Sequence, residues 1–265
     1  MDEQLMYDLI ENWDTYPVLL RVSMVAVIAL LVVCALVSLV VSIYLGISYY
    51  KYNRKENSVH KTGEEIARGV LDAYDLGHIA VKCSGSLMFG NSYSHYFKKV
   101  RLRRRTWKKS SVSSLAMAVQ KSCLAILDKE QDPDMVKRVR ITPWIYVGPI
   151  ACIPLILIGA VIDILVFDTV GMLTAVCSLL GVGLYALSFV MSVMVLKTEI
   201  KAQERAYKVA RICGIATEEE IVDMKKLFRL YNIEYINNMI TALLELILRV
   251  LTIIAKSKSG SSSKK

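Results

Sequence analysis

Three long stretches without a charged residue constrain this chain more than any other feature of its sequence. They are Val22–Tyr50, Ile141–Ile162 and Thr169–Leu196, with 29, 22 and 28 residues. A helix needs about 20 mostly apolar residues to cross the hydrocarbon core of a bilayer. Charged residues still make up 22% of the chain, so apolar and charged residues are segregated. The pattern predicts an integral membrane protein with a sizeable polar part, and it excludes a soluble enzyme, a disulfide scaffold and a disordered tail protein.

The charges themselves are placed unevenly along the chain. Residues 1–17 contain five acidic residues and no Lys or Arg, whereas residues 50–140 contain 19 Lys and Arg and nine Asp and Glu. Basic segments next to membrane helices stay in the cytoplasm. We therefore expect a plasma-membrane protein of bacterial type with its N-terminus outside and residues 51–140 in the cytoplasm.

The net charge of +9 has two further interpretations besides topology. It favours attraction to the anionic headgroups of the bilayer, and the basic run Arg101–Lys109 could hold a phosphate group. Nucleic-acid binding is the alternative, but no DNA- or RNA-binding motif surrounds that run. We expect the lipid bilayer as a partner and no nucleic acid.

The order of segments predicts a mainly α fold: a multi-pass membrane protein with three to four transmembrane helices and a small cytoplasmic α+β unit. The predicted segments are an acidic extracytoplasmic tail at 1–17, a transmembrane helix at 18–50, a basic cytoplasmic unit at 51–140 with a buried helix at 110–127, a transmembrane helix at 141–167, a third transmembrane helix at 169–213 that continues into the cytoplasm, a C-terminal helical region at 217–255 with a possible fourth transmembrane helix, and a disordered basic tail at 256–265.

Local motifs divide the cytoplasmic unit further. A capping box at Thr62–Glu65 predicts the start of a helix, and a second one at Thr217–Glu220 begins the last helical region. Alternation of side chains predicts two short strands, His78–Cys83 and Lys99–Arg103, with a turn between Gly85 and Gly90. Gly214 is placed to end the long third membrane helix.

The segment Tyr235–Ala255 is apolar except for Glu245 and Arg249. These two residues are four apart on a helix and could form an ion pair on one face. We favour a fourth membrane span, although the lysines that follow would then lie outside, against the trend for basic residues. An interfacial helix would avoid that conflict.

Several segments resemble the YugP-like family of membrane zinc metallopeptidases. The similar segments are the helix Thr62–Asp72, the two-strand region with Gly85, Leu87 and Val100–Leu102, the pair His95-Tyr96, the helix Ser111–Ile126, and Thr198–Ala206. The resemblance covers roughly residues 50–250. It implies that the cytoplasmic α+β unit is metallopeptidase-like and that Ser111–Ile126 corresponds to the catalytic helix.

That helix departs from the family's pattern at the residues that carry the chemistry. The family has an HExxH motif, in which two histidines one turn apart bind zinc and the glutamate activates water. The corresponding residues here are Gln120-Lys121-Ser122-Cys123-Leu124. The resemblance places Glu199 at the third zinc ligand. One carboxylate does not hold a catalytic zinc, so we expect no cofactor and no catalytic residues at Gln120, Lys121 and Leu124.

Other residues offer little to replace the lost ligands. The three histidines are His60, His78 and His95, and none has the HxxxH spacing. Cys123, His95 and Glu199 form a conceivable substitute metal site, although Cys123 is more simply a small packed residue. A thiol protease using Cys123 and His95 would lack a group that orients the histidine.

Without zinc, Glu199 would be a partly buried charge that costs several kcal/mol unless it is paired. We therefore predict that Lys121 pairs with Glu199 in place of the metal. The alternative is that Lys121 points to solvent while Glu199 interacts locally with Lys201, Gln203 or water.

These interpretations predict a catalytically inactive membrane-peptidase homologue that acts by binding another membrane protein, as a regulator, adaptor or assembly factor. One alternative is an active membrane peptidase with a non-standard metal or thiol site. Another is a small transporter or channel component, for which intramembrane charges would line a path. The candidates for such charges are Arg21, Asp163, Glu245 and Arg249.

Overall fold

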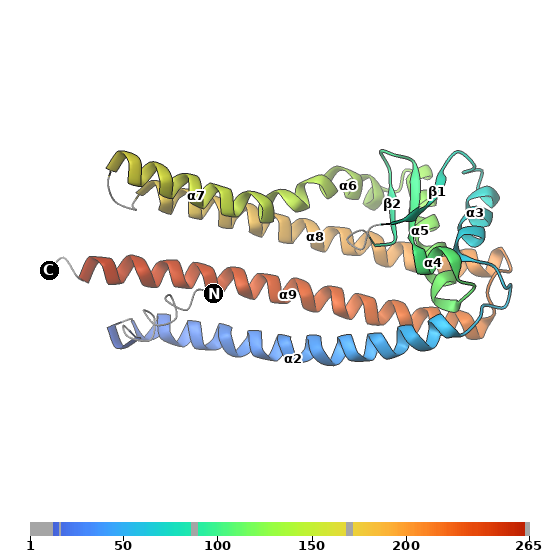
Figure 1. Cartoon of the computed structure of the whole chain (residues 1–265), viewed down its shortest axis with the longest axis horizontal. Helices are drawn as coiled ribbons and strands as arrows, with labels where there is room; N and C mark the ends of the chain where they lie inside the picture. The colour runs from blue at the N-terminus through green and yellow to red at the C-terminus, as the bar shows by residue number, and fades with distance from the viewer. Residues whose placement is uncertain (1–12, 16, 86–89, 168–171, 263–265) are drawn as a thin grey trace. The chain divides into compact units, whose positions relative to one another are not determined.

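The computed structural model describes residues 13–15, 17–85, 90–167 and 172–262, and the fold is mainly helical (Figure 1). The chain divides into two compact units. The first, which we call the helical unit, comprises Met1–Leu39, Trp144–Val190 and Ile236–Lys265. The second, which we call the mixed unit, comprises Val40–Pro143 and Met191–Tyr235.

Long helices make up the helical unit. They are α2 (Val18–Arg54), α7 (Val147–Phe167), α8 (Met172–Ile212) and α9 (Glu218–Ser262), with the short 3-10 helices η1 (Trp13–Thr15) and η2 (Thr142–Tyr146) before α2 and α7. Helices α2, α8 and α9 continue into the mixed unit. Within the helical unit, Asn237 of α9 donates hydrogen bonds to Ser38 Oγ and the Cys34 carbonyl of α2.

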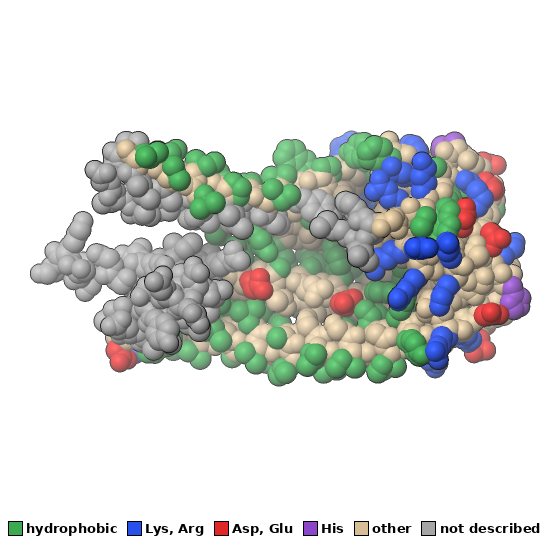
Figure 2. Space-filling model, in the orientation of Figure 1, with side chains coloured by type: hydrophobic (Ala, Val, Ile, Leu, Met, Phe, Trp, Pro, Cys, Tyr) green, Lys and Arg blue, Asp and Glu red, His purple; other side chains and the backbone are tan. Residues whose placement is uncertain are grey.

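Two helices in the described part of the chain contain a stretch long and apolar enough to cross a membrane: α2, and α8 within Leu179–Ile212, where the uncharged residues end at Leu196. Figure 2 shows hydrophobic side chains exposed along α2, which fits a helix surrounded by lipid rather than by protein. The 141–167 segment, predicted as the second span, and the 235–255 segment, predicted as a possible fourth, stay predictions.

The mixed unit builds a small sheet beside a buried helix. The strands are β1 (Ala80–Ser84), β2 (Ser92–Ser94) and β3 (Lys99–Arg103), in the order β1-β3-β2. Strand β1 runs parallel to β3, and β2 runs antiparallel to it. The helices are α3 (Gly63–Ala73), α4 (Arg104–Lys108), α5 (Val112–Lys129) and α6 (Pro133–Ile141).

Helix α5 forms the centre of this unit. Every residue from Val112 to Asp128 is buried, because small and aliphatic side chains on all faces let neighbouring elements approach it closely. Ser111 caps its first turn by accepting a hydrogen bond from the Ser114 amide. The same core includes residues of α3, the sheet, and the parts of α8 and α9 that belong to this unit.

Two helix ends follow the motifs in the sequence. The Thr62–Glu65 capping box is formed at α3, with both reciprocal hydrogen bonds present. Gly214 follows α8 with a φ of +62°, in the left-handed region that favours glycine at a helix end. A second glycine position, Gly63, is set by packing, since a Cβ there would clash with the Thr106 carbonyl oxygen.

The structure also differs from the sequence-based expectations. Strand β2 and helices α4 and α6 were not predicted, and the predicted turn at Gly85–Gly90 lies largely outside the described residues. Helix α9 continues to Ser262 instead of ending at Ala255. Lysine and serine are compatible with a helix, and no proline interrupts this stretch.

Candidate functional site

Glu199 lies at the centre of a polar cluster in the mixed unit, on α8 and three residues beyond the uncharged stretch. Its Oε2 accepts hydrogen bonds from Lys121 Nζ at 2.8 Å and from Gln120 Nε2 at 3.0 Å. Its Oε1 accepts one from an Arg138 guanidinium nitrogen at 2.7 Å. We call these four residues the Glu199 cluster. Both carboxylate oxygens are therefore engaged by nitrogen donors.

The buried helix α5 positions two of these donors. Gln120 and Lys121 are adjacent in sequence, both are buried, and both reach the same oxygen of Glu199. A lysine with a buried stem can direct its ammonium group to a partner in this way. The structure brings together Gln120, Lys121 and Glu199, which were considered from sequence. Leu124, one turn further along, is completely buried among apolar side chains.

Helix α6 brings in Arg138, which was not predicted from the sequence as part of a site. Asp132 caps α6 by accepting from the amides of Asp134 and Met135, and Pro133 occupies its first turn. Two lysines of α8 then hold this end of α6, because Lys201 pairs with both aspartates and Lys197 pairs with Asp134. The Asp132-Pro133 pair was the sequence signal for this helix.

The cluster carries one carboxylate against two cations. The side chains of Lys121, Arg138 and Glu199 are 11%, 13% and 20% exposed. Burial alone would raise the pKa of Glu199, but the positive charges and hydrogen bonds of Lys121 and Arg138 outweigh it and hold that pKa below its usual value. Glu199 is therefore ionised at neutral pH, and Arg138 Nε is left buried without a hydrogen-bond partner.

This donor set does not fit a zinc ion. Zinc is held in proteins by histidine nitrogen, cysteine sulfur and carboxylate oxygen. The neighbours of Glu199 are an ammonium, a guanidinium and an amide, and the first two would repel a divalent cation. Within the residues the structure describes, no three His, Cys, Asp or Glu side chains lie close enough to hold a metal ion.

Cys123, His95 and Glu199 are consequently not brought together as a substitute site. Cys123 is completely buried, and burial raises the pKa of its thiol, so the reactive thiolate is disfavoured. His95 instead lies with its Nδ1 2.8 Å from both carboxylate oxygens of Asp128. A thiol nucleophile activated by His95 would need these two side chains side by side.

Asp128 is the centre of a second polar group that was not anticipated. It is buried near the end of α5 and accepts hydrogen bonds from Tyr93 Oη at 2.6 Å and Lys98 Nζ at 3.2 Å, besides contacting His95. Burial opposes its ionisation, yet these contacts hold its pKa below the usual value. Because three of its partners belong to the β2–β3 hairpin, Asp128 fixes that hairpin to the core.

The charged residues that were candidates for lining a transport path lie in different environments. Arg21 forms an exposed ion pair with Asp14 at 3.0 Å. Asp163 is buried and accepts a hydrogen bond from the Leu173 amide at the start of α8. Glu245 is exposed on α9, and the side chain of Arg249 lies outside the described residues.

Comparison with known proteins gives the class of protein. Residues 27–255 match the family model described as putative neutral zinc metallopeptidase, so the chain belongs to that family. It is similar to a protein of Bacillus subtilis (strain 168) named putative membrane protease YugP, with 25% identity over 204 residues, which cover 76% of this chain and 84% of the relative. No solved structure matches the chain.

Proposed function

We propose that this member of the zinc-metallopeptidase family does not hydrolyse peptides and acts by binding another membrane protein, as a regulator, adaptor or assembly factor. The proposal places Gln120–Leu124 at the position of the family's HExxH motif and Glu199 at its third ligand. It takes zinc to be absent from the working protein.

The observation that carries the proposal is that both carboxylate oxygens of Glu199 already accept hydrogen bonds from protein side chains. Lys121 and Gln120 bind one oxygen and Arg138 binds the other. A metal ion would have to displace two cations whose charge already compensates the carboxylate. The position where a peptidase needs a general base holds Lys121, whose ammonium group donates a hydrogen bond to Glu199 and offers no acceptor to a water molecule. On this proposal, these positions supply neither a set of zinc ligands nor a general base for hydrolysis.

The topology forms part of the same proposal. The acidic first segment would lie outside the plasma membrane, and the basic residues 51–140 would lie in the cytoplasm. The proposal includes three to four membrane spans. The match to a relative named as a membrane protease and two helices long enough to cross a bilayer support a membrane location.

Zinc content and peptidase activity, measured on one detergent-purified sample of the full chain, test the loss of catalysis. We expect zinc far below one atom per chain and no hydrolysis of a casein substrate, with or without added zinc. Stoichiometric zinc that is lost in Glu199→Ala or Cys123→Ser would overturn the proposal and favour a peptidase with a non-standard site.

The binding role has its own test. Cross-linking in native membranes, followed by purification of the chain, should recover a specific membrane protein at a reproducible ratio. A chain that cross-links only to itself, and that carries an ion current in reconstituted vesicles, would instead favour the transporter alternative.

A further inference from the structure

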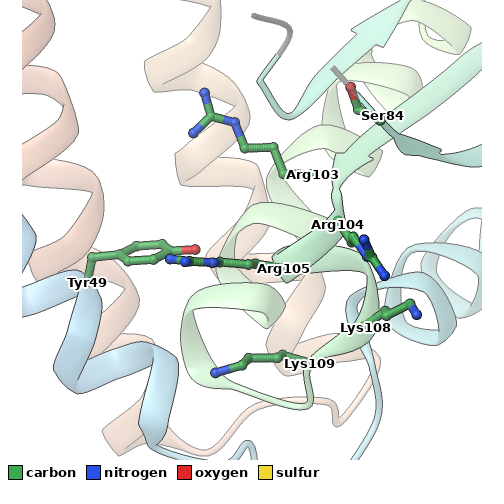
Figure 3. A pocket seen from close by; sticks show the side chains of 8 residues that line it. Tyr49, Ser84, Arg103, Arg104, Arg105, Lys108 and Lys109 are labelled. Atoms are coloured by element: carbon green, nitrogen blue, oxygen red, sulfur yellow. The ribbon is translucent and has the colours of Figure 1, made fainter. Parts of the chain in front are cut away.

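A cavity of about 820 Å³ lies in the mixed unit, away from the Glu199 cluster. Its lining is dominated by cations from the end of β3 and from α4, together with Tyr49 of α2. The lining residues are Tyr49, Ser84, Gly85, Arg103, Arg104, Arg105, Lys108 and Lys109. Figure 3 shows Arg103, Arg105 and Lys109 extending toward the side on which Tyr49 lies, whereas Arg104 and Lys108 point the other way.

None of these five cations has a carboxylate partner among the described residues. Each is exposed, and the ion pairs found elsewhere in the mixed unit involve other lysines and arginines. Figure 2 shows lysine and arginine side chains gathered over the surface of this unit. The cavity therefore holds a strong positive charge that no carboxylate of the described residues neutralises through an ion pair.

The adjoining sheet extends this charge. Lys99, Arg101 and Arg103 alternate along β3 and share one face, because side chains two apart in a strand point the same way. Lys82 of β1 is directly opposite Arg101 in the parallel register. Val100 and Leu102, on the other face, are fully buried in the core.

Like charges placed opposite each other in a sheet destabilise it. Burial lowers the pKa of Lys99, and the positive charges of Arg101 and Lys82 lower it further. A bound anion would relieve this cost. The row of cations on the sheet leads into the cavity through Arg103, which belongs to both.

The position of the cavity along α2 indicates where such an anion comes from. Tyr49 lies in the last two residues of the uncharged stretch Val22–Tyr50, and Lys51 and Arg54 follow at once. Tyrosine at the end of an apolar helix, followed by basic residues, marks the depth of the lipid headgroups. The preceding α2 side chains of this unit, such as Val40, Ile43 and Ile47, are exposed and apolar. A lipid whose chains lie along this face of α2 would present its headgroup to the cavity.

We infer that this cavity binds the headgroup of an anionic phospholipid that carries more than one negative charge, such as phosphatidate or cardiolipin. Arginine guanidinium groups bind phosphate oxygens in pairs of parallel hydrogen bonds, and lysine adds a point charge. Three cations on the Tyr49 side exceed what a single phosphodiester would neutralise. This site is separate from the Glu199 cluster and does not depend on whether the protein has lost its peptidase activity.

The test is native mass spectrometry of the full chain in detergent, with dioleoyl phosphatidate, cardiolipin, phosphatidylglycerol or phosphatidylcholine added at equal concentration. We expect one retained molecule of phosphatidate or cardiolipin, weaker retention of phosphatidylglycerol, and none of phosphatidylcholine. The variant Arg103→Gln/Arg105→Gln/Lys109→Gln should lose about a hundredfold in affinity, since each cation near an anionic lipid contributes about fivefold.

A matched variant, Lys137→Gln/Lys208→Gln/Lys226→Gln, changes the net charge by the same amount at exposed residues outside the cavity. It should bind lipid like the unmodified chain. Equal losses in the two variants, or equal retention of phosphatidylglycerol and phosphatidate, would show general charge attraction and overturn the site.

Competition with glycerol 3-phosphate and with inorganic phosphate tests whether the ligand is a soluble phosphate instead of a lipid. If either displaces phosphatidate at equal concentration, the ligand is a soluble phosphate and the lipid assignment is wrong. Thermal unfolding checks that both variants are folded.

Discussion

Lys121 and Glu199 come from different helices, 78 residues apart in the chain, and meet with Nζ 2.8 Å from Oε2. Arg138 binds the other oxygen of the same carboxylate at 2.7 Å. The cluster thus has one more cation than anion. Removing the anion should therefore disturb it more than removing either cation, and this asymmetry can be measured.

We expect Glu199→Gln to lower the free energy of unfolding by about 3 kcal/mol, because it leaves two cations together in a mostly buried site. Lys121→Met should cost only about 1 kcal/mol, since Arg138 still pairs with Glu199 and the methionine keeps the apolar stem packed. Denaturant unfolding of the full chain in a mild detergent, followed by circular dichroism, measures both values.

Glu204→Gln on the same helix is the control, because Glu204 is exposed and is not part of the cluster. It should change the free energy of unfolding by less than about 0.5 kcal/mol. A loss in Lys121→Met as large as that in Glu199→Gln would mean that Arg138 does not share the carboxylate in solution.

The lowered pKa of Glu199 also predicts how stability changes with pH. A carboxyl group whose pKa is lower in the folded than in the unfolded chain stabilises the fold above its unfolded value, here 4.5. That contribution is lost as the pH falls through the lower, folded pKa. Between pH 8 and 6 the contribution of Glu199 should be constant, and below about pH 4.5 it should decrease.

Glu199→Gln has no such group to titrate. The difference in unfolding free energy between the unmodified chain and this variant should therefore be flat above pH 6 and should shrink in acid. Measuring both chains at each pH cancels the contributions of Asp128, Glu220 and the other carboxyl groups that have lowered pKa values. A difference that grows on acidification would contradict the assigned direction.

Part of this site could be predicted from the sequence, because its residues lie in segments that local sequence features identify. Gln120 and Lys121 lie in a predicted helix that contains no glycine or proline, and Glu199 lies in a polar segment that follows an apolar one. The resemblance to a peptidase family linked the two segments. The placement of Cys123 and His95 depends on tertiary structure: packing buries Cys123 and directs His95 to Asp128.

Arg138 could not be found in this way. Its role depends on α6 folding back against α8, which is set by contacts such as Lys201 with Asp132 and Thr198 with the Asp134 carbonyl. These contacts join residues more than 60 apart in the chain. Strand β2 was missed for a simpler reason, since three residues, Ser92–Ser94, are too few for alternation to be visible.

Arg138 also predicts what introducing an HExxH motif at Gln120–Leu124 would achieve. The variant Gln120→His/Lys121→Glu/Leu124→His supplies HExxH, but Arg138 would still hold one oxygen of Glu199. We expect weak zinc binding in this triple variant and at least tenfold tighter binding once Arg138→Gln is added, because a hydrogen bond to a charged group is worth about 1.5–3 kcal/mol. Competition with a chromophoric chelator measures both affinities.

The control adds Arg140→Gln to the triple variant in place of Arg138→Gln, since Arg140 is exposed and lies on the same helix. It should leave zinc affinity unchanged. The triple variant should also be less stable, because Leu124 is fully buried and an imidazole there costs about 2 kcal/mol or more. If the triple variant alone binds zinc tightly, Arg138 is not what keeps a metal from Glu199.

The Tyr93–Asp128 hydrogen bond predicts how the β2–β3 hairpin is held. At 2.6 Å the phenol donates to a buried carboxylate, and a hydrogen bond to a charged acceptor contributes about 1.5–3 kcal/mol. Tyr93→Phe keeps the ring in the core and removes only this donor. We expect a loss of about 2 kcal/mol in unfolding free energy, together with faster amide exchange in the hairpin.

Tyr96→Phe provides the comparison in the same hairpin. Tyr96 is 67% exposed, and its hydroxyl lies 3.5 Å from the Val139 carbonyl, at the limit of a hydrogen bond. Its removal should change stability by less than about 0.5 kcal/mol. Asp128→Asn should cost more than Tyr93→Phe, because the amide weakens the contacts with Tyr93, His95 and Lys98 together. Equal effects of Tyr93→Phe and Tyr96→Phe would mean that apolar packing of α5 against the sheet, rather than Asp128, holds the hairpin in place.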